Sequence, residues 1–183
     1  NSVSVKEVDY INAYLVPAQD VVVEKRSEPF LELSPMSKGS APTDGGHLLL
    51  SRDEVEELGL TWVQRLKVVR RFLGSEDTIN GNERFCLWLS AVDENELRAY
   101  AGLKTRLAAV RQMRLESVKV QTRALADSPY SFGEIRQEGD ELPIVIPRHS
   151  SESREYLPFA LGSVGDIVAD SASALYNAPF WNI

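Results

Sequence analysis

The 183-residue chain contains a single cysteine, Cys86, so no disulfide bond can form within it and a reducing compartment is expected. No apolar run approaches the roughly 20 residues that a membrane-spanning helix needs, so we expect no segment that crosses a bilayer. The start of the chain also lacks the charged and apolar regions of a signal peptide. Because the chain begins at Asn1 without an initiator methionine, we expect it to be a fragment of a longer protein.

The sequence contains no recognisable catalytic or zinc-binding motif. With two histidines, His47 and His149, and one cysteine, the chain has no His-rich or Cys-rich zinc motif. The Gly-x-Ser-x-Gly sequence that carries the nucleophile of many hydrolases does not occur. We therefore expect that this segment is not an enzyme by itself, and that its candidate functional residues serve binding.

The composition, 43% hydrophobic and 26% charged, is typical of a folded globular protein. Residues 1–183 are long enough for a single domain with its own core. We predict an α+β fold with a mixed, mostly antiparallel sheet and one prominent basic helical segment. Short strands are predicted at residues 10–16, 21–25, 47–50, 68–74, 84–90, 130–137, 144–147, 156–161, 166–169 and 173–176, with a long loop at 27–46.

Local signals predict where several of these elements begin and end. Ser51 and Glu54 have the spacing of a capping box that opens a short helix, which Gly59 would end. The pair Asn80-Gly81 between two apolar stretches predicts a two-residue hairpin turn. Residues 99–126 contain no proline and predict a long helix with a possible break at Gly102.

Charge is distributed unevenly along the chain. The net charge is −7, but residues 98–123 carry seven basic residues and one acidic residue, which gives +6 for this stretch and −13 for the rest. An acidic body with one basic stripe produces a directional field that the net charge conceals. A solvated helix face is the ordinary explanation of such a stripe, but an exposed helix usually mixes both signs.

Helical periodicity separates this stretch into a cationic side and an apolar side. The apolar side, predicted to face the core, comprises Leu103, Leu107, Val110, Met113 and Val118. Arg106 and Arg114 project on this apolar side, where they would snorkel, pair with acids of the body or mark a helix break. The cationic side, predicted to neutralise DNA phosphates without reading sequence, comprises Lys104, Arg111, Lys119 and Arg123.

Residues 132–156 contain two strand-like stretches, joined by a polar turn, that are rich in hydrogen-bond donors. Base edges are read by Arg for guanine, by Asn or Gln for adenine and by carboxylates for cytosine. On a strand, Glu134 and Arg136 would share one face. The alternative is an internal salt bridge of Glu134, Arg136 and Arg154 that holds the sheet together. The candidate DNA-contacting residues here are Arg136, Arg148, Ser150, Ser151 and Arg154, with the serines as phosphate or turn hydroxyls.

The stretch 132–156 and seven further blocks, all in order, resemble the target-recognition domain of the MmeI-type (type IIL) restriction–modification enzymes. These enzymes are DNA adenine methyltransferases that are often fused to an endonuclease. The seven blocks cover nearly the whole chain: Ile11-Asn-Ala-Tyr-Leu, Val23-Glu-Lys-Arg, Pro42-Thr-Asp-Gly-Gly, Arg71-Phe-Leu-Gly-Ser-Glu, Ile79-Asn-Gly, Arg84-Phe-Cys-Leu-Trp-Leu and Asp166-Ile-Val-Ala-Asp-Ser-Ala.

The resemblance implies that the chain is the specificity module of a DNA adenine-N6 methyltransferase, which clamps the duplex while the target adenine is flipped out. Its partners would be double-stranded DNA and the methyltransferase domain of the same polypeptide, with no membrane, in a prokaryotic cytoplasm. Blocks shared with the family would form the frame. Less similar neighbours, such as residues 138–141 and 152–153, would discriminate between bases.

The catalytic motifs of such an enzyme are missing from this segment. It has no Gly-rich loop for S-adenosylmethionine and no Pro-Pro pair of the kind that holds a flipped adenine, and Val23-Glu-Lys-Arg lacks the spacing of a nuclease site. S-adenosylmethionine, and Mg²⁺ if a nuclease is fused, would bind elsewhere in the parent protein. Two alternatives remain open. One is an interaction domain whose basic helix docks on an acidic partner, and the other is an RNA-binding module, which would lack an evident stacking platform.

Overall fold

The computed structural model describes residues 4–19, 24–25 and 34–179 of the chain, which divides into two compact units, Asn1–Glu32 and Leu33–Ile183. In the first unit, the side-chain oxygen of Asn12 accepts hydrogen bonds from the backbone N–H groups of Tyr14 and Val16 at 3.0 and 3.1 Å. This turn replaces the strand predicted at residues 10–16, which is therefore wrong. The strand predicted at residues 21–25 lies mostly outside the described residues.

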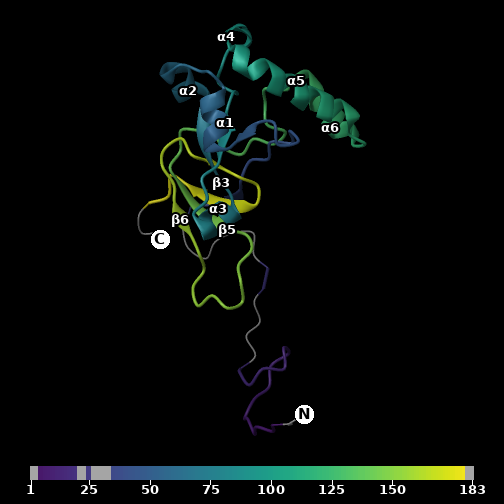
Figure 1. Cartoon of the computed structure of the whole chain (residues 1–183). Helices are drawn as coiled ribbons and strands as arrows, with labels where there is room; N and C mark the ends of the chain where they lie inside the picture. Colours follow the sequence, from purple (N-terminus) through teal and green to yellow (C-terminus); the bar gives the residue numbers. More distant parts are fainter. Residues whose placement is uncertain (1–3, 20–23, 26–33, 180–183) are drawn as a thin grey trace. The chain divides into compact units, whose positions relative to one another are not determined.

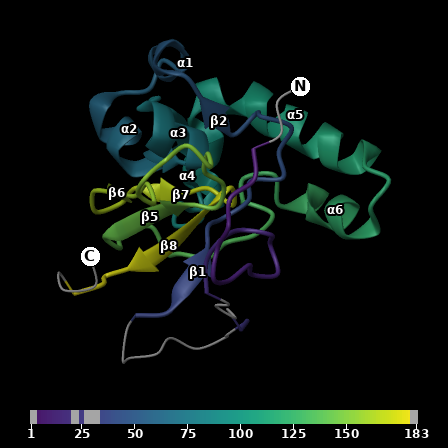
Figure 2. The same ribbon diagram turned by 90° about the horizontal axis from the view of Figure 1, so that it is seen from below.

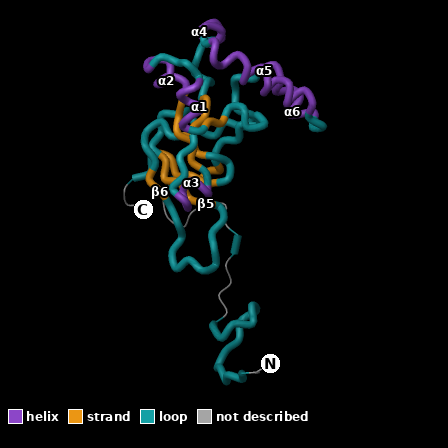
Figure 3. Tube along the Cα trace, in the orientation of Figure 1, coloured by secondary structure: helices purple, strands orange, loops and turns teal. Residues whose placement is uncertain are grey.

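The second unit contains two four-stranded sheets (Figures 1 and 3). One sheet has the strand order β1-β8-β5-β6 with antiparallel pairs. The other has the order β2-β4-β3-β7, in which β3 and β7 are parallel and the other pairs are antiparallel. This confirms the α+β class. The strands are β1 (Met36–Lys38), β2 (Leu49–Leu50), β3 (Val69–Leu73), β4 (Phe85–Leu87), β5 (Pro143–Pro147), β6 (Ala160–Leu161), β7 (Ile167–Val168) and β8 (Ala172–Tyr176).

The connection between β3 and β4 differs from the predicted hairpin turn. The two strands pair antiparallel, with Arg70 opposite Cys86, as their apolar patterns indicate. However, helix α3 (Ser75–Asn80) lies between them and ends at Gly81, whose φ is 71°. Glycine after asparagine suits a left-handed residue both in a tight hairpin turn and at the end of a helix. Here it ends a helix, so the two-residue turn is wrong while the strand pairing is correct.

Three other predicted boundaries also change. Residues 130–137 form no strand, although the Ala41 and Glu134 backbones exchange two hydrogen bonds of 2.9 and 3.0 Å as an isolated bridge. β1 lies within the predicted loop 27–46, part of which is outside the described residues. The strand predicted at 156–161 is reduced to β6. The partners of these segments are distant in sequence, so local patterns do not place their boundaries.

Side-chain caps begin the first two helices. α1 (Arg52–Glu57) follows Ser51, whose hydroxyl accepts from the Glu54 N–H while the Glu54 carboxylate accepts from the Ser51 N–H. This confirms the predicted capping box, and Gly59, with a φ of 63°, follows the helix end as predicted. α2 (Trp62–Val68) begins with the same reciprocal arrangement.

The predicted long helix is divided. Its break lies at Tyr100, with a ψ of 87°, and not at Gly102. Gly102 lies inside the next helix. A Cβ atom at this position would be 2.0 Å from the carbonyl oxygen of Leu58 at the end of α1, so a larger residue would clash with it. The glycine therefore permits close packing of the two helices. The pieces are α4 (Glu94–Ala99), α5 (Ala101–Glu116), α6 (Val120–Ala124) and the 3₁₀ turn η1 (Leu125–Asp127).

The inner face of α5 packs on a core that also includes β3, β4 and β7. Leu103 and Val110 are completely buried, as helical periodicity predicts. Val118 is 92% exposed, so its predicted core position is wrong, because α5 ends at Glu116 before reaching it. In Figures 1 and 2, α5 and α6 project to one side of the sheets.

Arg114, on the inner face of α5, is the largest completely buried side chain among the described residues. Its guanidinium has five N–H groups, and each donates to a backbone carbonyl. The acceptors are Thr43 at 3.0 Å for Nε, Leu125 and Ser128 at 2.9 and 2.8 Å for Nη1, and Pro42 and Ser131 at 3.1 and 2.7 Å for Nη2. Desolvation lowers the pKa of Arg114, although the nearby Asp44 carboxylate opposes this shift.

Arg106 lies two turns earlier on the same side of α5. Its Nη1 donates to the carbonyl groups of His47 and Leu49 at 3.2 and 3.3 Å, and its Nη2 forms an ion pair with Glu54. The placement of Arg106 and Arg114 on the apolar side is therefore confirmed. Both arginines donate to backbone carbonyls of the segment that runs from Pro42 towards β2. Two of the seven basic residues of the stretch therefore stabilise the fold.

Replacing Arg114 by lysine should lower the free energy of unfolding by about 2–4 kcal/mol, because an ammonium group has three donors and leaves buried carbonyls without partners. Urea denaturation measures this loss. The matched control is Arg111→Lys on the exposed side of the same helix, which should change stability by no more than about 0.5 kcal/mol. Equal midpoints for the two variants would contradict the structural role of Arg114.

Candidate nucleic-acid interface

The structure separates the predicted DNA-contacting residues into two sets. The helix set consists of Lys104, Arg111, Lys119 and Arg123, on and beside α5 and α6. The loop set consists of Arg136, Arg148, Ser150, Ser151 and Arg154, before and after β5. In Figure 1, α5 and α6 lie at the upper right, whereas the segment that follows β5 extends below the sheets. The two sets are therefore not brought together at one site.

All four side chains of the helix set are exposed. Lys104 and Arg111 project from α5, Lys119 is the residue before α6, and Arg123 donates from Nη1 to the carbonyl of Ser117 at 2.7 Å. Because the chain is extended at Ser117, the four residues do not share one continuous helix face. Within the described part of the chain, no carboxylate forms an ion pair with any of them, so their charge faces solvent.

The loop that follows β5, residues 148–157, is exposed throughout. Inside it, the hydroxyl groups of Ser151 and Ser153 lie 2.7 Å apart, and the Arg154 N–H donates to the Ser151 carbonyl at 3.1 Å. The Ser150 side chain is available to solvent, as is that of Arg154. These contacts shape a turn that presents hydroxyl and guanidinium donors outwards.

Arg148 fixes the start of this loop. Its backbone N–H donates to the Ser75 hydroxyl at 3.1 Å, and its Nη1 donates to the Asp170 carbonyl at 3.2 Å. The Ser75 hydroxyl in turn donates to the Ser171 carbonyl at 2.5 Å. The buried Ser75 thus ties the beginning of α3, the turn before β8 and the end of β5 together.

Arg136 forms an ion pair with Glu134, two residues earlier in the chain. Its Nε donates to Glu134 Oε1 at 2.7 Å, while Lys38 Nζ donates to Oε2 of the same carboxylate at 3.0 Å. These hydrogen bonds, from Arg136 first and then from Lys38, lower the pKa of Glu134. The geometry matches the Glu134–Arg136 part of the internal ion pair that the sequence left as an alternative, although the Arg136 side chain remains half exposed. Among the described residues, Lys38 and not Arg154 is the second cation on Glu134.

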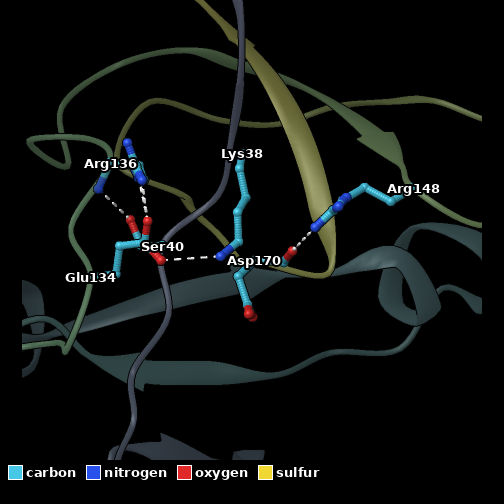
Figure 4. A network of polar contacts seen from close by, with 6 residues as sticks. All are labelled: Lys38, Ser40, Glu134, Arg136, Arg148 and Asp170. Carbon is cyan, nitrogen blue, oxygen red and sulfur yellow. Dashed lines mark hydrogen bonds and ion pairs between the residues drawn. The ribbon is translucent and has the colours of Figure 1, made fainter. Parts of the chain in front are cut away.

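Ser40 connects two of the three arginines of the loop set, Arg136 and Arg148 (Figure 4). Its hydroxyl accepts from the Arg136 N–H at 2.9 Å, and its carbonyl accepts from the Asp170 N–H at 3.0 Å. Asp170 is the residue whose carbonyl holds the Arg148 guanidinium. Sequence reasoning did not single out Lys38, Ser40 or Asp170 as site residues, because they are distant in sequence from the arginines, although Asp170 lies in one of the blocks that resemble the family.

Hydrogen bonds from its own backbone and from Trp88 hold the turn at residues 138–141, a predicted site of base discrimination. The Glu141 carboxylate accepts from the N–H groups of Glu138 and Gly139 at 2.7 and 2.8 Å. Burial acts to raise the pKa of Glu141, but these backbone hydrogen bonds outweigh it, so its pKa is lowered. The Glu138 carbonyl accepts from Trp88 Nε1 at 3.1 Å, which attaches the turn to the core.

In both sets, exposed cationic side chains and hydroxyl groups project from backbone segments that hydrogen bonds hold in place. Such groups bind phosphate oxygens and base edges. In the described residues, no group of three or more His, Cys, Asp or Glu side chains is placed to hold a metal ion. None of the helices described is long and apolar enough to cross a membrane.

Residues 17–183 match the family model of the MmeI target recognition domain, and the chain belongs to this family. It is similar to DNA methyltransferase A of Bacillus subtilis (strain 168), with 28% identity over 96% of this chain and 20% of that protein. It also resembles the solved structure of the Type IIL restriction-modification enzyme MmeI in complex with DNA. That similarity has a TM-score of 0.80 and 32% identity, and it covers 94% of this chain and 23% of the MmeI chain.

The chain thus spans between a fifth and a quarter of the length of these two relatives. The family membership confirms the resemblance drawn from the sequence blocks. The individual DNA-contacting residues of the helix set and the loop set remain predictions.

Replacing Ser75 by alanine should lower the free energy of unfolding by about 1–3 kcal/mol, because the Arg148 N–H and the Ser171 carbonyl lose a shared partner in a buried position. Amide hydrogen exchange at Arg148 should become faster at the same time. Ser150→Ala, in the exposed loop, serves as the control with no expected change. Unaltered exchange at Arg148 in Ser75→Ala would show that Ser75 does not hold the loop.

Proposed function

We propose that this domain recognises a specific sequence in duplex DNA as the specificity module of a DNA adenine-N6 methyltransferase. The observation that supports this most strongly is the similarity, over 94% of the chain, to MmeI as solved in complex with DNA. The membership in a family named for target recognition agrees with it. The exposed donors of the helix set and the loop set supply the chemistry that such recognition requires.

The two sets have different tasks in this proposal. The helix set neutralises phosphates and attracts DNA through its field, because its cations have no carboxylate partners among the described residues. The loop set lies on a backbone that Ser40 and Ser75 hold in place. Rigid placement suits direct hydrogen bonds to base edges or to phosphates beside them. Residues 138–141 and 152–153 would discriminate between bases.

Catalysis belongs to other parts of the polypeptide in this proposal. A methyltransferase domain would bind S-adenosylmethionine and the flipped adenine, and a fused nuclease would use Mg²⁺. These 183 residues contain neither a Gly-rich cofactor loop nor a Pro-Pro pair. The single buried Cys86 suits a reducing cytoplasm, where DNA is the partner.

Replacing Lys104, Arg111 and Lys119 together by glutamine should weaken duplex binding by the full-length protein that carries this domain. Three lost phosphate contacts would reduce the steepness of the plot of log affinity against log salt concentration by up to about 2.7. Fluorescence anisotropy at several salt concentrations measures both quantities.

A matched control for this variant adds the same charge change elsewhere, at exposed positions near β4: Asn82→Asp, Ser90→Asp and Ala91→Asp. This control should lower affinity only slightly, because long-range fields are screened beyond about 8–10 Å. Equal losses in the two triple variants would mean that net charge alone matters and that the helix set makes no contact.

Arg148→Ala should reduce affinity for the recognised sequence by about tenfold or more, because a hydrogen bond from a charged guanidinium to DNA is worth about 1.5–3 kcal/mol. The melting temperature should fall by no more than about 2 °C, since the side chain is exposed and its hydrogen bond is a surface one. Calorimetry and binding on the same sample separate the two effects. A large fall in melting temperature with unchanged affinity would assign Arg148 a structural role instead.

A further inference from the structure

Glu134 holds both cations that surround it. Lys38 Nζ contacts one carboxylate oxygen at 3.0 Å, and Arg136 Nε contacts the other at 2.7 Å. All three side chains are accessible, with exposures of 40% for Lys38, 51% for Arg136 and 33% for Glu134. The cluster therefore carries a net charge of +1 at the surface, where two free cations would carry +2.

The backbone fixes the three side chains relative to one another. Lys38 is the last residue of β1 and lies opposite Ser173 of β8. Glu134 forms the bridge with Ala41, and the Arg136 N–H is held by Ser40 (Figure 4). The backbone contacts of its own segment consequently hold Glu134 beside both cations.

A carboxylate and a phosphodiester bind guanidinium and ammonium groups through the same charge-assisted hydrogen bonds. A DNA phosphate that approaches Lys38 or Arg136 must therefore share or displace Glu134. This competition is the same for every DNA sequence, because phosphates carry no sequence information. It lowers the part of the binding energy that does not depend on sequence.

We propose that Glu134 is a built-in competitor of DNA phosphate for Lys38 and Arg136, and that it limits sequence-independent binding. This inference rests on the proposed function, since it needs DNA to approach this surface. When the sequence-independent part of the binding energy is smaller, the protein dissociates faster from the many competing sites in a genome. It leaves discrimination to contacts with base edges.

The Glu134 carboxylate keeps its negative charge near neutral pH. Hydrogen bonds from Arg136 and then from Lys38 lower the pKa of Glu134, so the carboxylate stays ionised at neutral and mildly acidic pH. A group with a lowered pKa loses its charge only at still lower pH, so binding between about pH 6 and 8 should not depend on its titration.

The test is Glu134→Gln in the full-length protein that carries this domain, with short duplexes that do or do not contain its recognised sequence. Affinity for both duplexes should rise about three- to tenfold, and the salt dependence should steepen by about one counter-ion. Glu57→Gln is the matched control, because it removes one exposed negative charge from α1 with no side-chain contact among the described residues. It should leave both quantities nearly unchanged.

A double variant tests the mechanism of the gain. Lys38→Gln combined with Glu134→Gln restores the net charge of the cluster, so affinity and salt dependence should return close to the wild-type values. If Glu134→Gln melts well below the wild type, both variants are measured at a temperature below its melting transition, where the comparison with Glu57→Gln still holds.

Three outcomes would overturn the inference. Equal affinities of Glu134→Gln and Glu57→Gln would show that no competition occurs. A loss confined to the recognised duplex would show that Glu134 itself accepts a hydrogen bond from a base. Failure of the wild-type protein to bind either duplex would remove the proposed function together with the inference, which distinguishes that failure from the other two.

Discussion

The interaction on which the rest of the second unit depends is the burial of Arg114. A buried guanidinium is tolerated only when its hydrogen bonds are complete, and here five backbone carbonyls complete them. These carbonyls come from the segment at Pro42 and Thr43 and from the segment between Leu125 and Ser131. One side chain thus joins the segment at Pro42 and Thr43 to the end of the basic helical region and the turn that follows η1.

The same two segments continue directly into the candidate interface. Residues 38–41 come directly before Pro42 in the sequence, and residues 133–136 come shortly after Ser131. They meet at the bridge between Ala41 and Glu134, where the Gly133 N–H also donates to the Pro42 carbonyl at 3.1 Å. Because Arg114 lies on the inner face of the helix that carries Lys104 and Arg111, it connects the support of the helix set with that of the loop set.

Features encoded by neighbouring residues could be predicted from the sequence. The capping box of Ser51 and Glu54 involves residues three apart, and the burial of Leu103 and Val110 follows helical periodicity. Asn80-Gly81 was ambiguous, because a left-handed glycine serves both a hairpin turn and a helix end. The family resemblance also came from the order of sequence blocks, and the family match confirms it.

Features that join distant segments could not be predicted. The Lys38–Glu134 ion pair links residues 96 positions apart, and nothing local marks Lys38 as part of a binding surface. Periodicity placed Arg114 on the buried side, but its carbonyl partners lie in segments without any regular pattern. The segment around Glu134 was predicted as a strand, but it forms only one bridge, with Ala41. Whether a segment becomes a strand depends on its pairing with distant residues, which the local pattern does not contain.

We propose that this chain determines which DNA sequence is recognised by the protein that carries it. The most direct measurement exchanges residues 17–183, the matched range, into the corresponding position of a related methyltransferase and maps the methylated adenines by sequencing. The hybrid should methylate the target of the protein that carries this chain. A hybrid that continues to methylate the recipient's own target would contradict it.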